Sequence, residues 1–389
     1  MHDPRLDKIA DVLVNYSLGV REGQKALINV PPLAEALGGG VAVKVLEAGG
    51  HPMVRLQFAG MKELMYRHAS DEQLAFIPRA VAEYYREADL TFNIFAPVNP
   101  HTFKAVPSER KKILDAALRQ SLKEARGDAG GCCGSGKAVA VSFPTLSSAQ
   151  RVQMSLADYE EFYFGALLPD PNDPVGYWRK QSEWQAEVVE HLKGKESVRI
   201  VAEGTGLTMG ISGRTFVNET GQGNVPGSEL YVGPVEGTAA GHVTLSFPTY
   251  RQGQRIEGVR LEFAEGRVVN AAADLSGDVF LRALDTDEGA RNLGELGTGT
   301  NTGITQHTGS VLYDEKMADT FHLALGGGVA GNKNKSSQHW DIVSDLRSDG
   351  RIYADDELIY ENGRFTIDEQ CRGKIPGGPA TYDRAWPPT

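Results

Sequence analysis

Cysteine is scarce in this chain, with 3 residues in 389. Cys132 and Cys133 are adjacent, and Cys371 lies far away in the sequence. Neighbouring cysteines rarely bridge each other and the total is odd, so a disulfide framework is not expected. We predict that Cys132 and Cys133 are reduced, accessible thiols that are dispensable for activity. This cysteine usage favours a reduced, cytoplasmic protein.

Long apolar runs and basic runs are missing as well. No window approaches the roughly 20 apolar residues that span a bilayer. The first residues carry Asp3, Asp7 and Asp11 where a signal peptide would have a basic start and an unbroken apolar stretch. The formal net charge of −11 opposes binding to nucleic acid. We therefore expect neither a membrane nor a nucleic acid as partner.

Two glycine-rich segments resemble nucleotide-binding motifs but depart from them. GCCGSGKA (131–138) has Ala138 where the phosphate-binding loop needs Ser or Thr, and a strand pattern follows it instead of a helix. GTGLTMG (204–210) has the dinucleotide-binding spacing, yet no helix pattern follows it. Both segments are interpreted as glycine-rich turns.

The length of 389 residues favours two domains, and the two halves of the sequence have different patterns. The first half alternates segments of helical periodicity with short apolar runs, and a helical, Trp-containing stretch (151–194) follows. The expected helices include 70–89 and 108–126, and the expected strands are 26–30, 52–58, 90–97 and 138–143. This alternation predicts an α/β N-terminal domain, residues 1–194, in which a parallel sheet carries helices on both faces.

From about residue 195 short β-type segments dominate, separated by many glycines and by hairpin signals such as Ala264-Glu265-Gly266. Little helical periodicity remains in this half. We predict a β-rich α+β domain over residues 195–389, made mostly of antiparallel strands, and we expect it to hold the metal site.

The segment SSQHWDIV (336–343) carries the first chemical signal. Residues two apart in a strand point to the same face, so His339 and Asp341 would converge while Trp340 points away. An imidazole beside a carboxylate suits a divalent metal ion. Taken alone, the pattern fits equally well a structural hydrogen bond between the two side chains.

Further potential ligands accumulate in the same half of the chain. Glu229 and Glu295 follow or lie between glycines, and His322 comes shortly before the glycine run 326–328. With His339 and Asp341 they make five oxygen and nitrogen ligands. Five ligands suffice for two metal ions that share a bridging carboxylate, an arrangement that activates water against an amide.

Four blocks of this half carry a resemblance to a known family. They are N-x-P-x-x-E at 224–229, G-E-L-G at 294–297, D-E-K followed by H-x-A-x-G at 314–326, and S-x-x-H-x-D at 336–341. The opening segment NYSLGVREGQKALI and residues 143–162 also match. The sequence therefore resembles, nearly end to end, the metallo-aminopeptidases named for aminopeptidase T and aminopeptidase S.

The resemblance implies a two-metal hydrolase that acts on peptides or small amides. The divalent ions would be Zn, Co or Mn, two per chain, and the protein would form a homodimer around an internal cavity. Glu315 would be a further ligand or a catalytic proton-transfer group. Carried over by position, the implied metal ligands are Glu229, Glu295, His322, His339 and Asp341.

The chain departs from the family pattern at Val329, because family members have a tyrosine seven residues after the first ligand histidine. That hydroxyl can stabilise the tetrahedral intermediate, so its loss predicts poor turnover of generic aminopeptidase substrates. Tyr313 or the backbone N–H groups of residues 326–328 are candidate replacements.

A relative of the family supports an alternative function. It cleaves the ring of 2,5-dihydroxypyridine with one Fe(II) ion held by two histidines and an aspartate. His339 and Asp341 fit that site, but its other histidine aligns with Glu295, which favours the hydrolase. A non-catalytic binding protein is the third possibility, and metal analysis separates the three.

Overall fold

The structure is a computed structural model that describes residues 3–58, 60–99, 101–126, 137–251 and 253–367. Cys132, Cys133 and Cys371 lie outside these residues, as does most of the glycine-rich segment 131–138. Within the described ranges, no helix has the length and apolar character that crossing a membrane requires.

The N-terminal half forms a five-stranded parallel sheet, called sheet A. The inner strand β1 (Lys25–Val30) is buried along most of its length, which explains its continuous apolar run. In order across the sheet the strands are β2 (His51–Leu56), β1 (Lys25–Val30), β3 (Leu90–Phe95), β4 (Ala138–Ser142) and β8 (Asn224–Val225). The last strand, β8, comes from the second half of the sequence and pairs with β4 through Ala140–Asn224 and Val141–Val225.

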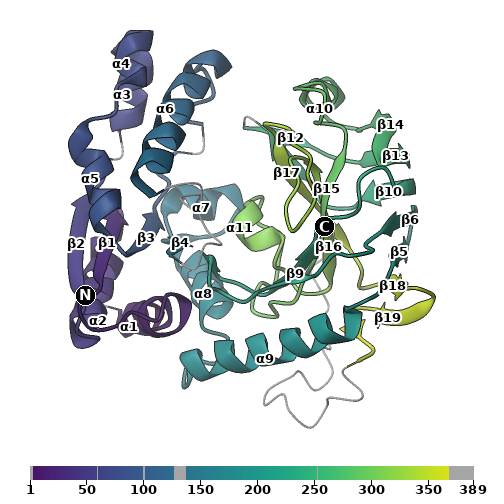
Figure 1. Cartoon of the computed structure of the whole chain (residues 1–389), viewed down its shortest axis with the longest axis horizontal. Helices are drawn as coiled ribbons and strands as arrows, with labels where there is room; N and C mark the ends of the chain where they lie inside the picture. Colours follow the sequence, from purple (N-terminus) through teal and green to yellow (C-terminus); the bar gives the residue numbers. More distant parts are fainter. Residues whose placement is uncertain (1–2, 59, 100, 127–136, 252, 368–389) are drawn as a thin grey trace.

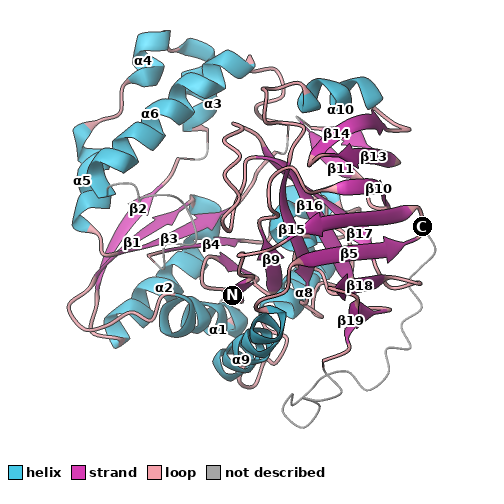
Figure 2. Cartoon of the chain, turned by 45° about the vertical axis from the view of Figure 1, so that its right-hand side comes forward, coloured by secondary structure: helices cyan, strands magenta, loops and turns pink. Residues whose placement is uncertain are grey.

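Helices cover both faces of sheet A. Figure 2 shows α1 (Pro4–Asp11) and α2 (Glu35–Glu47) on one side of the sheet and α5 (Arg79–Glu87) and α6 (Ser108–Arg126) on the other. Short elements complete this half: α3 (Met61–His68), α4 (Asp71–Ala75), the π-helix Val12–Ser17 and the 3-10 turn Pro32–Ala34. The prediction of an α/β N-terminal region with a parallel sheet is confirmed.

The single helix expected over residues 70–89 is wrong, because two helices occupy this range. Ser70 caps the first, α4, in a reciprocal pair with Gln73, as its position predicts. Helix α4 ends at Ala75, and α5 begins at Arg79, directly after Pro78. Proline has no backbone N–H and pushes the preceding residue out of the helical region, so the chain is extended at this point.

Two antiparallel sheets dominate the second half. The eight-stranded sheet, sheet B, has the order β14 (Arg267–Ala272), β13 (Val259–Ala264), β10 (Ala240–Leu245), β6 (Thr205–Gly210), β5 (Ser197–Ala202), β18 (Arg351–Ala354), β19 (Glu357–Glu361) and β20 (Arg364–Phe365). The five-stranded sheet, sheet C, has the order β17 (His339–Asp345), β16 (Thr320–Gly326), β15 (Leu293–Gly299), β9 (Glu229–Val232) and β7 (Val217–Glu219). The hairpin β11 (Thr249–Arg251) and β12 (Gln254–Ile256) and the helix α10 (Gly277–Leu284) complete this half.

Sheets B and C enclose one apolar core. Alternate residues of β13, Val259, Leu261 and Phe263, are buried there together with Leu296 and Leu323 of sheet C. The opposite face of sheet C is thereby left for polar side chains. The expected β-rich second region is confirmed.

Three helices link the halves: α7 (Leu146–Arg151), α8 (Leu156–Leu167) and α9 (Pro174–Leu192). Helix α9 runs beneath both halves (Figure 1). Its Trp178 is buried in the N-terminal core, whereas Val188 is buried between sheets B and C. A second link is the segment 300–319, which joins β15 to β16 and contains α11 (Val311–Asp314). Its Ile304 belongs to the N-terminal core, so this segment and α11 lie between the two halves (Figure 1).

Candidate metal centre

Sheet C carries all five of the expected ligand side chains on one face, called the ligand face. In the strand register Glu295 lies opposite Ala324, which lies opposite Asp341. His322 is two residues from Ala324, and His339 is two residues from Asp341. Glu229 lies opposite Gly299, which is four residues after Glu295. Residues an even number apart in a strand point to the same side, so all five side chains share the face. Across the sheet the order is His339 and Asp341 on β17, His322 on β16, Glu295 on β15 and Glu229 on β9.

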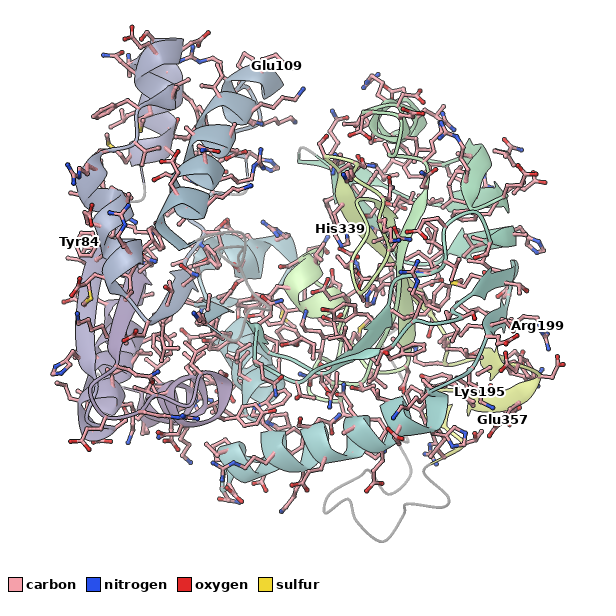
Figure 3. The ribbon with its side chains drawn as sticks, in the orientation of Figure 1. Tyr84, Glu109, Lys195, Arg199, His339 and Glu357 are labelled. Carbon is pink, nitrogen blue, oxygen red and sulfur yellow. The ribbon has the colours of Figure 1, made fainter. Side chains whose placement is uncertain are left out.

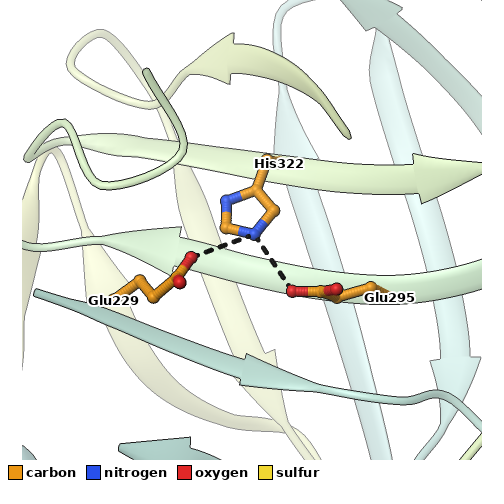
Figure 4. A group of neighbouring side chains, drawn as sticks. All are labelled: Glu229, Glu295 and His322. Atoms are coloured by element: carbon orange, nitrogen blue, oxygen red, sulfur yellow. Dashed lines mark hydrogen bonds and ion pairs between the residues drawn. The ribbon is translucent and has the colours of Figure 1, made fainter. Parts of the chain in front are cut away.

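Glu295 takes part in two groups of potential ligands. In the first, His322 Nε2 lies 3.4 Å from Glu295 Oε1 and 3.5 Å from Glu229 Oε2 (Figure 4). In the second, His339 Nε2 lies 3.3 Å from Glu295 Oε2 and 3.3 Å from Asp341 Oδ2. Each group has one ligand atom per residue within 4.8 Å of the others. The two carboxylate oxygens of Glu295 therefore face different groups.

The spacing of these atoms fits a cation in each group. Ligands at 2.0–2.2 Å from a tetrahedral ion lie about 3.3–3.6 Å from one another, which matches the observed 3.3–3.5 Å. Charged hydrogen bonds are shorter, about 2.7–2.9 Å. Glu229 Oε2 and Asp341 Oδ1 are buried without a hydrogen-bond partner among the described residues, which is costly unless a cation binds there. The residues present thus fit divalent metal ions.

Local backbone features bring the ligands onto this face. A β-bulge between Leu293 and Glu295 switches the strand so that Leu293 faces the core and Glu295 the ligand face. At Gly297, opposite His322, a Cβ atom would overlap the imidazole ring. The second glycine of G-E-L-G, Gly297, therefore leaves room for the His322 ring beside Glu295.

Electrostatics in the centre favour positive charge. Burial raises the pKa of Glu295, but hydrogen bonds from His322 and His339 outweigh it and lower the pKa to about 2. Burial lowers the pKa of both histidines, yet the surrounding carboxylates raise it to about 9 for His322 and about 11 for His339. The same negative field that holds protons on these rings attracts metal cations.

Glu315 contacts a lysine that the sequence reasoning missed. Lys316 is fully buried and pairs with Glu315 and with Glu229, whose Oε1 lies 3.3 Å from Nζ. Burial lowers the pKa of Lys316, but the two carboxylates outweigh it and raise the pKa. Burial also raises the pKa of Glu315 and of Glu229, and the charge of Lys316 offsets this only in part. The adjacent D-E-K letters were the available signal for this pair.

The two suggested replacements for the missing tyrosine hydroxyl are not available. The N–H groups of Gly326, Gly327 and Gly328 donate to backbone carbonyls of residues 292, 338 and 334. Tyr313 is buried in the N-terminal core, with its ring 5.8 Å from that of Phe162. Both suggestions are therefore wrong, because these groups are used in packing and loop structure.

Tyr231 lies on the ligand face, two residues after Glu229, and the sequence reasoning also missed it. Burial raises the pKa of its phenol, and the charges of Glu229 and Glu295 raise it further, so the phenol keeps its proton at neutral pH. The even spacing from Glu229 within a strand was the signal that could have found it.

Comparison with known proteins identifies the family of the chain. The family model for thermophilic metalloproteases (M29) matches residues 2–365. The chain belongs to the M29 family of thermophilic metalloproteases. The expectation of a metal-dependent hydrolase of the aminopeptidase T and S type is confirmed by this match.

Among its relatives, aminopeptidase 2 of Geobacillus stearothermophilus is 27% identical over 352 residues, which cover 83% of this chain and 84% of that protein. The structure of wild-type AmpT from Thermus thermophilus is similar with a TM-score of 0.79 and 21% identity, over 94% of this chain and 99% of that one. A 2,5-dihydroxypyridine dioxygenase from Pseudomonas putida is similar with a TM-score of 0.57 and 16% identity, over 94% and 98%. These two structures share the fold with this M29 member.

Proposed function

We propose that this M29 protein is an aminopeptidase that releases N-terminal residues from peptides or small amides with a two-metal centre. The observation that carries the proposal is the position of Glu295, whose two oxygens face separate groups of ligands. Zn, Co or Mn are the proposed metals, because a mixed carboxylate and imidazole set suits them. We further propose that the protein acts in the cytoplasm as a homodimer, by analogy with the family.

Metal ions bound here would supply an activated water and polarise the substrate carbonyl. Glu229 and His322 would hold one ion, His339 and Asp341 the other, and Glu295 would hold both. Lys316 keeps the carboxylates of Glu229 and Glu315 in place through its two ion pairs. The excess of carboxylates over cationic side chains would also attract the protonated amino terminus of a peptide.

Glu315 is proposed as the proton-transfer group. Its side chain is 13% exposed, so it can be reached from the site while burial keeps its affinity for a proton high. It would accept a proton from the attacking water and pass it to the leaving amine. A direct role as metal ligand is less favourable, because Glu315 belongs to neither group of potential ligands and its Oε1 is engaged by Lys316, whereas Glu229 still presents Oε2 to His322.

The ring-cleaving dioxygenase remains the alternative to be tested. A facial triad needs two histidines and an aspartate around one ion. In this chain His322 and His339 belong to different groups, joined by Glu295. This separation supports the hydrolase over the dioxygenase.

Elemental analysis of the purified protein tests the proposal. We expect about two divalent ions per chain and hydrolysis of aminoacyl-nitroanilides or aminoacyl amides. Glu295→Gln should lose both ions, whereas Asp341→Ala should lose one. His191→Ala, which removes only a surface contact with Glu357, is the matched control and should keep both ions. One iron per chain with oxygen consumption on a dihydroxypyridine would establish the alternative, and a metal-free, inactive protein would indicate a binding function.

A further inference from the structure

Tyr231 occupies a position on the ligand face beside the first group of ligands. It lies directly opposite Gly297 of β15, and Gly297 lies directly opposite His322 of β16. The row therefore reads Tyr231, Gly297, His322, and its middle member has no side chain. The His322 ring extends over Gly297 towards β9 and Glu229 (Figure 4). The phenol of Tyr231 and the imidazole of His322 thus border the same space above Gly297.

The Tyr231 side chain also has the accessibility that a substrate contact requires. Glu229, Glu295 and His322 are buried, whereas Tyr231 is only partly buried. Among the described residues its hydroxyl has no hydrogen-bond partner, whereas the buried Trp340 of the same sheet donates to Thr249. A hydroxyl that is not hydrogen-bonded to another side chain can donate a hydrogen bond to a bound molecule.

Most other hydrogen-bond donors near the ligand face are engaged, and Nδ1 of His322, which has no partner among the described residues, is itself buried. Lys316 is held by Glu315 and Glu229, and the N–H groups of residues 326–328 donate to backbone carbonyls. The two histidines face carboxylates. Amide hydrolysis develops negative charge on the carbonyl oxygen, and a donor directed at that oxygen accelerates the reaction.

We propose that Tyr231 donates a hydrogen bond to the carbonyl oxygen of the scissile amide, an inference that rests on the proposed function. Water attacks the carbonyl carbon, a C–O bond forms, and the π electrons move to the oxygen. Tyr231 keeps its proton and stabilises that oxyanion by donation. When the intermediate collapses, the C–N bond breaks, the amine leaves with the proton released by water, and the oxygen again becomes a carbonyl. The phenol thus acts as a catalytic residue without a change in its own protonation.

Tyr231→Phe removes the hydroxyl and keeps the ring. On an aminoacyl-nitroanilide we expect kcat to fall about 100- to 1000-fold while KM stays nearly constant, because the lost interaction is strongest in the transition state. Metal content should be unchanged. In calorimetry, affinity for an aminoalkyl phosphonate, a tetrahedral mimic, should fall about 100-fold, whereas affinity for the free amino acid should not. Tyr353→Phe is the control. The Tyr353 ring packs against the guanidinium of Arg199, and Figure 3 shows Arg199 at the outer edge of the molecule, away from His339.

The outcomes separate this inference from the proposed function. A wild-type protein that hydrolyses amides while Tyr231→Phe keeps its kcat would overturn the role of Tyr231 and leave the function intact. Loss of metal together with activity in Tyr231→Phe would make the residue structural and would also overturn the inference. A wild-type protein that neither binds divalent metal nor hydrolyses any amide would refute the proposed function and, with it, this inference.

Discussion

At the scale of single residues, a missing side chain determines where His322 can lie. Gly297 is opposite His322 in the sheet, and any Cβ there would occupy the space of the imidazole. The ring can reach both Glu229 and Glu295 only because this position is glycine. Conversely, a Cβ atom added at Gly39 of α2 would lie in open space, and the residue has a helical conformation.

Gly297→Ala should therefore displace His322 and weaken the first group of ligands. We expect loss of about one metal ion per chain and a drop in activity of at least 100-fold. Metal analysis and steady-state kinetics measure both effects. Gly39→Ala is the matched control and should leave both unchanged while stabilising the helix slightly. Full metal content in Gly297→Ala would show that His322 is not a ligand.

Asp319 links the stability of the protein to pH. Burial raises its pKa to about 6, and the nearby charge of Arg347 does not compensate. The folded state therefore binds a proton more tightly than the unfolded state, whose aspartate has a pKa near 3.9. Stability contributed by this proton is complete below about pH 4 and is lost as the pH rises to about 6.

Asp319→Asn should remove the loss of stability that accompanies deprotonation of Asp319. Asn tolerates the positive φ of 66° at this position as well as Asp does. We expect the variant to be more stable at pH 7–8 by about 1–2 kcal/mol and equal to the wild type near pH 4. Thermal unfolding at several pH values is the measurement, and an equal gain at all of them would exclude titration of Asp319 as the cause.

At the scale of elements, sequence patterns located most strands of the N-terminal sheet, and helix 108–126 agrees with α6. Local periodicity predicts such elements because it reports which face is buried. It did not find β8, whose two residues acquire strand conformation only by pairing with β4. Pro78 accounts for the break between α4 and α5, so this boundary is encoded locally in the sequence.

The site was predictable to a similar extent. The strand spacing of His339 and Asp341 indicated that their side chains converge, and in the structure His339 Nε2 lies 3.3 Å from Asp341 Oδ2. Which of the carboxylates meet across strands depends on register and on the bulge before Glu295, which no single segment encodes. Lys316 and Tyr231 each had a local signal in the sequence, but the contact of Lys316 with Glu229 and the position of Tyr231 opposite Gly297 join segments that are distant in sequence. The assignment of the five residues as ligands stays a prediction.

Helix α9 supports Glu229 from behind the sheet. Gln185 is fully buried, donates to the backbone carbonyl of Glu229 at 2.7 Å and accepts from Ser228 and Thr300. Ser228 itself has a positive φ of 93°, which these bonds help to hold. The helix thereby fixes the start of β9 and the position of its first side chain.

Gln185→Met should remove the hydrogen bond to the Glu229 carbonyl and the two bonds from Ser228 and Thr300, whose hydroxyls keep each other and Gln181 as partners. We expect unfolding to become easier by about 2–3 kcal/mol and metal affinity of the first group to fall about 10-fold. Denaturant unfolding and metal titration measure the two effects. Lys180→Met, an exposed change on the same helix, is the control. A loss of stability with unchanged metal affinity would mean that Gln185 supports the fold but not Glu229.

At the scale of the whole molecule, the two halves are interlocked rather than joined by one linker. Strand β8 of the second half completes sheet A, and Ile304, Tyr313 and Met317 fill the N-terminal core. These residues belong to the same segment as Lys316. The predicted domain boundary at residue 194 stays a prediction. Because the two halves share sheet A and the N-terminal core, we expect them to unfold together.

Asn301 is the single side chain that best tests this coupling. It is fully buried, and its amide donates to the carbonyls of Ala166 in α8 and of Gly227 before β9, at 3.0 and 3.2 Å. Its Oδ1 accepts from the N–H of Gly303. Asn301→Ala leaves these groups unpaired, so we expect a loss of about 2–4 kcal/mol. The exposed Asn270→Ala on β14 is the control.

Differential scanning calorimetry of the full chain distinguishes coupled from independent unfolding. If the halves are coupled, Asn301→Ala should shift one transition to lower temperature, and metal should be released in that same transition. The reason is that Asn301 bonds both to α8 of the N-terminal core and to the turn before Glu229. Two transitions, of which only one moves, would show that residues 1–194 and 195–389 are separately stable. The ligand face would then be held by the second half alone.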